Sequence, residues 1–217
     1  MGIAIRTVVV AMAALAVVGC GKQKSTCSGT DELDVLKTIV MDEAEKALTN
    51  EKHDDGSAVF NGASVRATLS KMSIAFENVR TAKEDPNSTK VFCEGSMKIV
   101  VPPEQLQSAE EGRKLAGFGT VAALASTSAM EQEANAFTKS IEYSAQPTDD
   151  GEKVYAELTD ANSIAEFMSE MVGSSLLKPM LEARKLEEAK AAEAADQAAE
   201  TQRLQAEQQQ QQLRAEQ

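Results

Sequence analysis

Residues 91–103 read VFCEGSMKIVVPP, and this stretch decides the fold. Its side chains alternate in character, with Val91, Cys93, Met97, Ile99 and Val101 on one face and Glu94, Ser96 and Lys98 on the other. This alternation predicts a strand with one buried and one wet face. Pro102 and Pro103 end it, because proline has no N–H to donate to a sheet. Cys93 therefore lies on the buried face.

Two more alternating runs follow. In the first we assign Phe137, Ile141, Tyr143 and Ala145 to the buried face and Lys139, Glu142 and Ser144 to the wet face; in the second Val154, Ala156 and Leu158 alternate with Lys153 and Glu157. The loop between them, QPTDDGE, contains an Asp-Gly step, which predicts a tight hairpin. A fourth strand is expected over about 70–82, preceded by a turn or short strand and followed by a turn at EDPNS.

A helix is predicted from residue 30 to about 50. Thr30 is assigned as its cap, Asp31 and Glu32 occupy the first turn, and apolar residues from Leu33 to Leu48 recur at helical spacing. The sequence thus predicts an α+β domain over 31–177, with one helix followed by about four antiparallel strands. That order resembles the cystatin-like arrangement of helix and sheet, and a fold by itself implies no function.

Residues 104–136 form an insertion that we expect to be helical. It contains LAGFGTVAALASTSAM (115–130), which is too short and too rich in Gly, Ser and Thr to span a membrane well. Two interpretations stay open for this segment. It is either a helix that covers the sheet or an element that docks on a partner or on lipid.

The last third of the chain is predicted to be helical. Ser163 and Glu166 have the spacing of a capping box, and Ile164, Phe167, Met168, Met171 and Val172 form an apolar stripe. Gly173, Ser174 and Ser175 are expected to loosen this helix. Residues 178–217 are rich in Ala, Glu and Gln and are expected to form a helical or disordered arm. Its leucines keep no sustained heptad, which disfavours a tight coiled coil.

At the other end, a charge-free run from Thr7 to Gly21 follows Arg6 and has the pattern of a signal peptide. It ends in Val17, Val18, Gly19 and Cys20, which resembles the lipobox of bacterial lipoproteins. The resemblance implies cleavage after residue 19, acyl chains on Cys20 as the membrane attachment, and a tether over 20–30. Gly21 and Lys22, where an aspartate is absent, then favour the periplasmic face of the outer membrane. A plain signal peptide or a short membrane anchor are the alternatives.

The net charge and the number of cysteines limit which partners the chain can bind and which compartment suits it. The chain has 34 acidic against 22 basic residues, and cleavage would remove only Arg6 among them. This balance disfavours nucleic acid and anionic lipid as partners. With Cys20 lipidated, Cys27 and Cys93 remain, and in an oxidising compartment they are expected to form a disulfide. The alternative is two buried free thiols.

No catalytic constellation is found, and neither a metal site nor a cofactor is expected. The sole histidine, His53, stands in a loop with no second ligand candidate nearby. The sequence therefore favours a non-catalytic, lipid-anchored binding or scaffold protein whose arm reaches a protein partner. A protective inhibitor, such as an immunity or surface-exclusion lipoprotein directed at a toxin, a lysozyme-like enzyme or a phage, is the alternative. A carrier of apolar ligands would need a cavity between helix and sheet.

Overall fold

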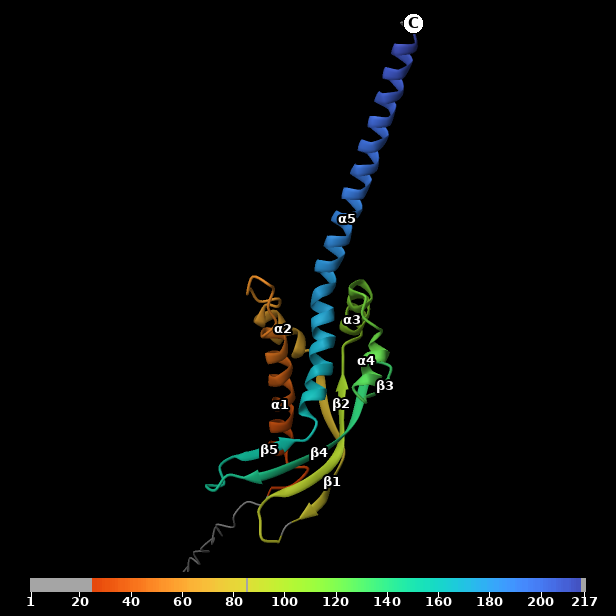
Figure 1. The fold of residues 1–217 in the computed structure, drawn as a ribbon. Coiled ribbons are helices and arrows are strands. Elements are labelled where there is room, and N and C mark those ends of the chain that lie inside the picture. The colour runs from red at the N-terminus through yellow and green to blue at the C-terminus, as the bar shows by residue number, and fades with distance from the viewer. Residues whose placement is uncertain (1–24, 85, 216–217) are drawn as a thin grey trace, which may run out of the picture.

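The computed structural model describes residues 25–84 and 86–215. It confirms an α+β fold, with one helix before an antiparallel sheet and a long helix after it (Figure 1). The elements in chain order are α1 (Thr30–Thr49), α2 (Gly62–Leu69), β1 (Ser73–Glu84), β2 (Val91–Val100), α3 (Pro103–Ala116), α4 (Val121–Thr127), β3 (Glu131–Glu133), β4 (Ala136–Pro147), β5 (Val154–Leu158) and α5 (Ala161–Ala215).

The sheet is built on β2 and β4, which pair without interruption from Val91 opposite Ala145 to Val100 opposite Ala136. β1 pairs with the other edge of β2, whereas β3 and β5 share the remaining edge of β4. The strand predicted from VFCEGSMKIVVPP and the hairpin predicted around QPTDDGE are both confirmed. The described sheet has one strand more than expected, because three residues of the insertion form β3.

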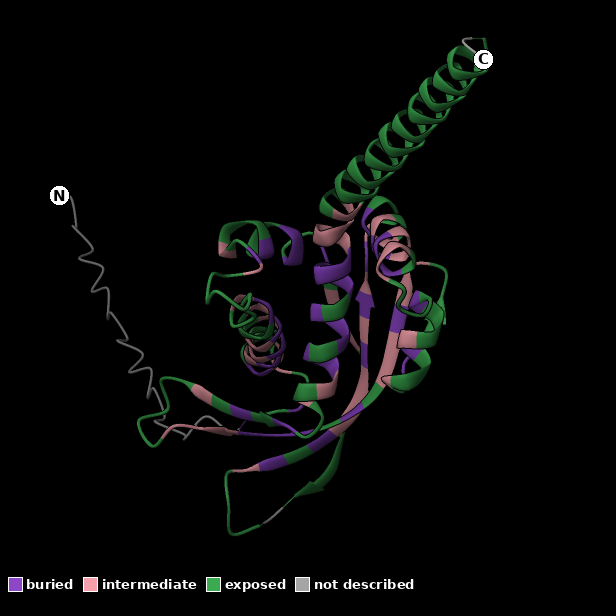
Figure 2. Cartoon of the chain, turned by 45° about the horizontal axis from the view of Figure 1, so that its top comes forward, coloured by how far each residue is buried: buried purple, intermediate pink, exposed green. Residues whose placement is uncertain are grey.

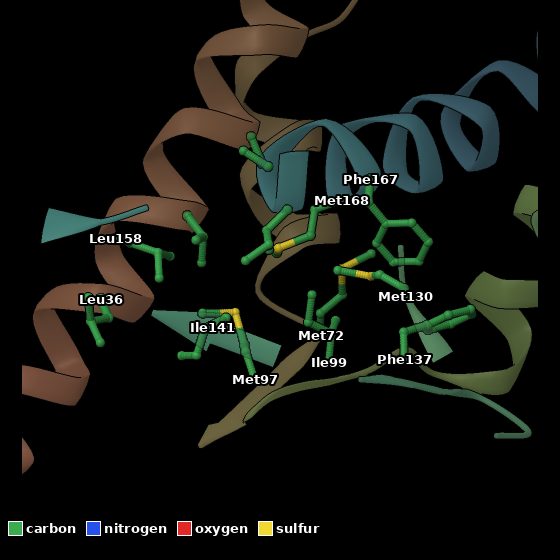
Figure 3. Packing of buried hydrophobic residues seen from close by; sticks show 14 of the residues in the cluster. Leu36, Met72, Met97, Ile99, Met130, Phe137, Ile141, Leu158, Phe167 and Met168 are labelled. Carbon is green, nitrogen blue, oxygen red and sulfur yellow. The ribbon is translucent and has the colours of Figure 1, made fainter. Parts of the chain in front are cut away.

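The core lies between the inner face of the sheet and the helices α1 and α5. Figure 3 shows Phe167 and Met168 of α5 pointing toward side chains of the sheet and of the loop before β3. The rings of Phe137 and Phe167 are 4.8 Å apart between centroids and inclined by 54°. All five residues of the apolar stripe predicted on α5 are fully buried. The stripe is therefore the part of α5 that closes the domain.

α2 corrects the expectation of a turn or short strand before residue 70. Its first turn is capped by the Asn61 side chain, which accepts hydrogen bonds from the backbone N–H groups of Ala63 and Ser64. Val65 and Leu69 lie four residues apart on the buried side of this helix. The cap and this spacing together favour a helix over the competing strand pattern.

Three predictions are wrong, two about where a helix begins and one about where a helix loosens. α1 takes Gly29 as its N-cap, with Thr30 as its first residue. α5 begins at Ala161, so Ser163 already lies inside the helix and cannot cap it. Gly173, Ser174 and Ser175 do not loosen α5, which continues unbroken through Pro179 to Ala215.

α3 packs closely against α5 at Gly112, next to Gly173 and Ser174. A Cβ atom at Gly112 of α3 would overlap the carbonyl oxygen of Ser174, and one at Gly173 would lie 3.0 Å from Leu48 Cδ2. Small residues here let α1 and α3 approach α5 closely. The residues that suggested a flexible joint are therefore points of close packing between helices.

Beyond this junction α5 becomes the arm. Every residue from 182 to 215 is exposed, and Figure 2 shows the change from buried residues near the sheet to exposed ones along the projecting helix. At 1.5 Å per residue this part extends roughly 50 Å. Pro179 removes the helical donor for the carbonyl of Ser175, a half-exposed residue that water can reach. The arm is thus a direct continuation of a core helix.

The close approach of α3 and α5 gives a stability prediction. Gly112→Ala should lower the free energy of unfolding by about 1–3 kcal/mol, because the added methyl must push α3 away from the Ser174 backbone. In an open helix the same change would be stabilising, by about 1 kcal/mol. Gly119→Ala is the control, since its Cβ would meet only Ala123 Cβ at 3.6 Å. Urea unfolding that shows equal midpoints for the two variants would contradict the packing.

Candidate functional site

The predicted disulfide between Cys27 and Cys93 is confirmed. It joins the turn before α1 to the second strand of the sheet, with a Cα–Cα distance of 5.6 Å between residues that are 66 positions apart in the sequence. Both cysteines are buried. Closing a loop of this length stabilises the folded state by on the order of 4 kcal/mol in the chain-entropy model. The bond is therefore a structural disulfide, and these two cysteines offer no accessible thiol.

Hydrogen bonds from two further residues surround the disulfide. The Tyr143 hydroxyl, on the strand next to Cys93, donates to the backbone carbonyl of Cys27. The backbone N–H of Thr26 donates to Glu32 Oε1 at 3.0 Å. We call Thr26, Cys27, Glu32, Cys93 and Tyr143 the N-terminal clasp. It fixes the first described residues to both α1 and the sheet.

Glu32 and Tyr143 were not expected to take part in this site. Glu32 follows the N-cap Gly29 by three residues, which is the spacing of the glutamate in a capping box. A Cβ at Gly29 would overlap Glu32 Oε2, so glycine leaves room for the carboxylate to fold back over the helix start. That spacing was the available signal in the sequence. Tyr143 was assigned correctly to the buried face, but its partner could not be known.

Cys20 lies outside the described residues, as do the signal peptide and the rest of the tether up to residue 24. The first described residue, Ser25, is buried and shares a hollow of about 70 Å³ with Glu32 and Val154. Pro147 and Gly151 of the β4–β5 turn line the same hollow. The chain therefore enters the domain beside the tip of this hairpin, at Ser25, which is five positions after Cys20 in the sequence.

Lys139 corrects one assignment on the sheet. It was placed on the wet face, but its register partner is Met97, and its side chain is only 10% exposed. Its Nζ donates to the Ser128 carbonyl at 3.0 Å and to Ser163 Oγ at 2.7 Å, with Asp160 Oδ2 at 4.0 Å. These oxygens satisfy the buried ammonium. Lys139 thereby ties β4 to the end of α4 and the start of α5.

The base of the arm is held by charged residues of α3. Lys178 forms an ion pair with Glu111 and lies 3.8 Å from Glu182. The hydrogen bond from Lys178 lowers the pKa of the Glu111 carboxyl, and the same contact raises the pKa of Lys178. About two turns earlier on α5, Glu170 Oε2 accepts a hydrogen bond at 2.9 Å from the buried Arg113, which also donates to the Gly119 carbonyl at 2.8 Å. The arm therefore leaves the domain in a direction that α3 helps to set.

An open groove of about 750 Å³ lies between α3, α4 and the β3–β4 turn. Its apolar lining comes from Pro103, Leu106, Val121 and Ala122. Glu110 lies at this groove and accepts a hydrogen bond from the Val121 backbone at 2.7 Å. The groove is on the outside of α3, whereas the space between α1, α5 and the sheet is filled by core side chains (Figure 3). The groove is thus on the surface, whereas the carrier hypothesis requires a cavity between helix and sheet.

Histidine and carboxylate side chains form no group of three or more metal ligands among residues 25–84 and 86–215. His53 lies exposed in the loop between α1 and α2. Within the same described ranges, the helices are too short or too polar to cross a membrane. No family model, curated protein or solved structure matches the chain. Function is therefore inferred from its own residues and their geometry.

The clasp gives a pH prediction. Burial, together with the nearby Glu32 carboxylate, raises the pKa of Tyr143 from 10.0 to about 12. Above pH 10 the unfolded chain releases this proton while the folded chain keeps it, so the free energy of unfolding should fall as pH rises toward 12.

Tyr143→Phe removes both the titration and the hydrogen bond to Cys27. The variant should be less stable by about 1 kcal/mol at neutral pH, and the difference should shrink between pH 10 and pH 12. Urea unfolding of both chains across this range measures the difference. The exposed Tyr155→Phe is the matched control. A stability difference that stays constant with pH would contradict the buried, neutral Tyr143.

Proposed function

We propose that the chain is a lipid-anchored lipoprotein of the bacterial cell envelope that acts as a non-catalytic binding or scaffold protein. Cys20 attaches it to the periplasmic face of the outer membrane, and the arm engages a protein partner. One observation carries this proposal. The chain enters the domain at the clasp and leaves it at the opposite end as an exposed helix (Figure 1).

The anchor is supported by the residues on both sides of Cys20. Val17, Val18 and Gly19 precede it at the end of a charge-free run. After it, only a few residues separate Cys20 from the buried Ser25 and the clasp. The Cys27–Cys93 bond suits an exported protein, because the periplasm is oxidising. Acyl chains on Cys20 would hold the protein stably, since two or more chains together anchor where one is marginal.

The arm is supported as a binding element by its exposure and its rigidity. Ion pairs such as Arg184–Glu188 and Lys190–Glu187 stabilise an isolated helix by a few tenths of a kcal/mol each. Leu186, Leu204 and Leu213 are between 48% and 62% exposed. A helix that projects roughly 50 Å and packs on nothing in its own domain is suited to reach another molecule. The acidic charge of the chain argues for a protein partner over nucleic acid.

A non-catalytic role is supported by how the buried polar groups are used. Lys139, Glu32, Arg113 and Tyr143 each bind another part of the same chain. Each of these contacts joins two elements of the fold, so the groups serve its stability. A protective inhibitor of a basic toxin or enzyme stays the alternative, because a net charge of −12 would steer a basic target toward it.

The proposal is tested with three forms of the full chain in the cell envelope: unmodified, Cys20→Ser, and a truncation that ends at Ala183. Cys20→Ser should move the protein from the membrane to the soluble fraction, because it removes the acylated atom. The truncation should stay on the membrane and should lose the crosslinked partner. Its circular dichroism should show that the domain up to Ala183 is still folded. Phe118→Ala, an exposed change on the domain, is the control.

Two results would count against the proposal separately. If Cys20→Ser remains in the membrane fraction, or mass spectrometry of the mature N-terminus finds an unmodified Cys20, the anchoring is wrong. If the truncation keeps the same crosslinks as the unmodified chain, the arm is not the binding element.

A further inference from the structure

Two exposed aromatic side chains lie together on the outer face of the sheet. Before the arm, three large apolar residues among those described are strongly exposed: Phe92 (39%), Phe118 (54%) and Tyr155 (54%). Phe92 of β2 is opposite Ser144 of β4, which is in turn opposite Glu157 of β5, two positions after Tyr155. Phe92 and Tyr155 therefore share one face and one end of the sheet.

Polar contacts connect the two rings into one patch. Lys90 Nζ lies 5.5 Å from the centroid of the Phe92 ring and 2.8 Å from Glu157 Oε2. The Tyr155 hydroxyl donates to Glu157 Oε1 at 3.5 Å, and Ser144 Oγ donates to Glu157 Oε2 at 3.3 Å. We call Lys90, Phe92, Ser144, Tyr155 and Glu157 the aromatic platform. The platform combines two exposed rings with the charged side chains of Lys90 and Glu157, while Ser144 lies buried between the strands that carry the rings.

The aromatic platform faces away from the helices. The neighbours of its members along each strand, among them Val91, Cys93, Tyr143 and Ala156, are buried on the inner face. Since side chains alternate along a strand, Phe92 and Tyr155 point to the opposite side. In Figure 1 this end of the sheet lies below α1, and the arm projects from the other end of the domain.

The described chain begins at the same end of the sheet. Cys27 is bonded to Cys93, the residue after Phe92, and Ser25 shares a hollow with Val154, the residue before Tyr155. Five peptide steps separate Ser25 from Cys20, and at about 3.6 Å each they span at most roughly 18 Å. Acyl chains on Cys20 would therefore hold the bilayer surface close to this end of the sheet.

We propose that the aromatic platform rests on the bilayer surface beside the anchor, so that the arm points away from the membrane. The proposal rests on the proposed lipid attachment at Cys20. Tyrosine and lysine side chains suit the headgroup layer, where one part of the side chain is apolar and the other is wet.

The surface that fits is zwitterionic lipid. The positive charge of the aromatic platform, Lys90, is paired with Glu157, and on the same face Glu94, which is paired with Arg80, stands opposite a further carboxylate, Glu142. These carboxylates, in a chain of net charge −12, would be repelled by anionic headgroups. Contact is therefore expected with phosphatidylethanolamine or phosphatidylcholine and should weaken as anionic lipid is added.

The absence of tryptophan from the sequence makes a direct test possible. Tyr155→Trp and Phe92→Trp each place a single tryptophan on the aromatic platform, and Leu213→Trp and Phe118→Trp place one on the arm and on the α3–α4 loop. Each chain is bound to phosphatidylethanolamine and phosphatidylcholine vesicles whose acyl chains carry bromine, which quenches tryptophan in contact with the bilayer. Two preparations are compared: the protein isolated from membranes, and the mature chain coupled at Cys20 to a maleimide phospholipid.

The Tyr155→Trp emission should fall about twofold on vesicles, because interfacial side chains lie ~5–10 Å into the boundary of headgroups and acyl chains. Leu213→Trp should be unchanged. The contact would be overturned if bromine quenched Tyr155→Trp no more than Leu213→Trp on vesicle-bound protein. It would also be overturned if Phe118→Trp were quenched more strongly than Tyr155→Trp. If the membrane-isolated protein fails to float with vesicles while the coupled chain shows the quenching, the anchoring is wrong and the contact stands.

Discussion

The fold depends on the burial of one segment of α5, from Ile164 to Ser174, among α1, α3 and the sheet. Burying a helix on several sides leaves little room for side chains, so α3 and α5 meet at Gly112 and Ser174, and α1 meets α5 at Gly173. Protein interiors are packed to crystal density, and such contacts tolerate little change in volume. The sheet, α1 and α3 are thus arranged around the first turns of α5.

The same helix links the core to the surroundings. Because α5 does not break at Gly173 or Pro179, the orientation of the arm is set inside the domain, with Lys178 and Glu111 adding a fastening at its base. At the other end the clasp ties the start of the domain to the same sheet through Cys27 and Tyr143. The clasp and the base of the arm are therefore parts of one folded domain. This geometry supports the proposed role of a tethered scaffold or binding protein.

The sequence was informative where one local rule decides the structure. Period-two alternation identified β2, β4 and β5, and apolar spacing identified α1 and the stripe on α5. Prediction from the sequence failed where contacts between distant parts of the chain determine the structure. Lys139 was assigned to the wet face because it is charged, although Ser128, Ser163 and Asp160 satisfy it inside. Gly173 and Ser174 suggested a loose joint, since a sequence cannot distinguish a small residue that frees a chain from one that admits a neighbour. For the candidate site, the pairing of Cys27 with Cys93 followed from cysteine count, whereas Glu32 and Tyr143 depend on the folded geometry.

The central claim is that a single helix runs from the core into solvent as a rigid arm. Small-angle X-ray scattering tests it most directly, on the mature chain with Cys20→Ser and on the same chain ending at Ala183. The distance distribution of the untruncated chain should show a long tail, and removal of the arm should shorten the maximum dimension by roughly 50 Å at 1.5 Å per residue. A maximum dimension that changes little on truncation would show that the arm folds back on the domain, which contradicts the account.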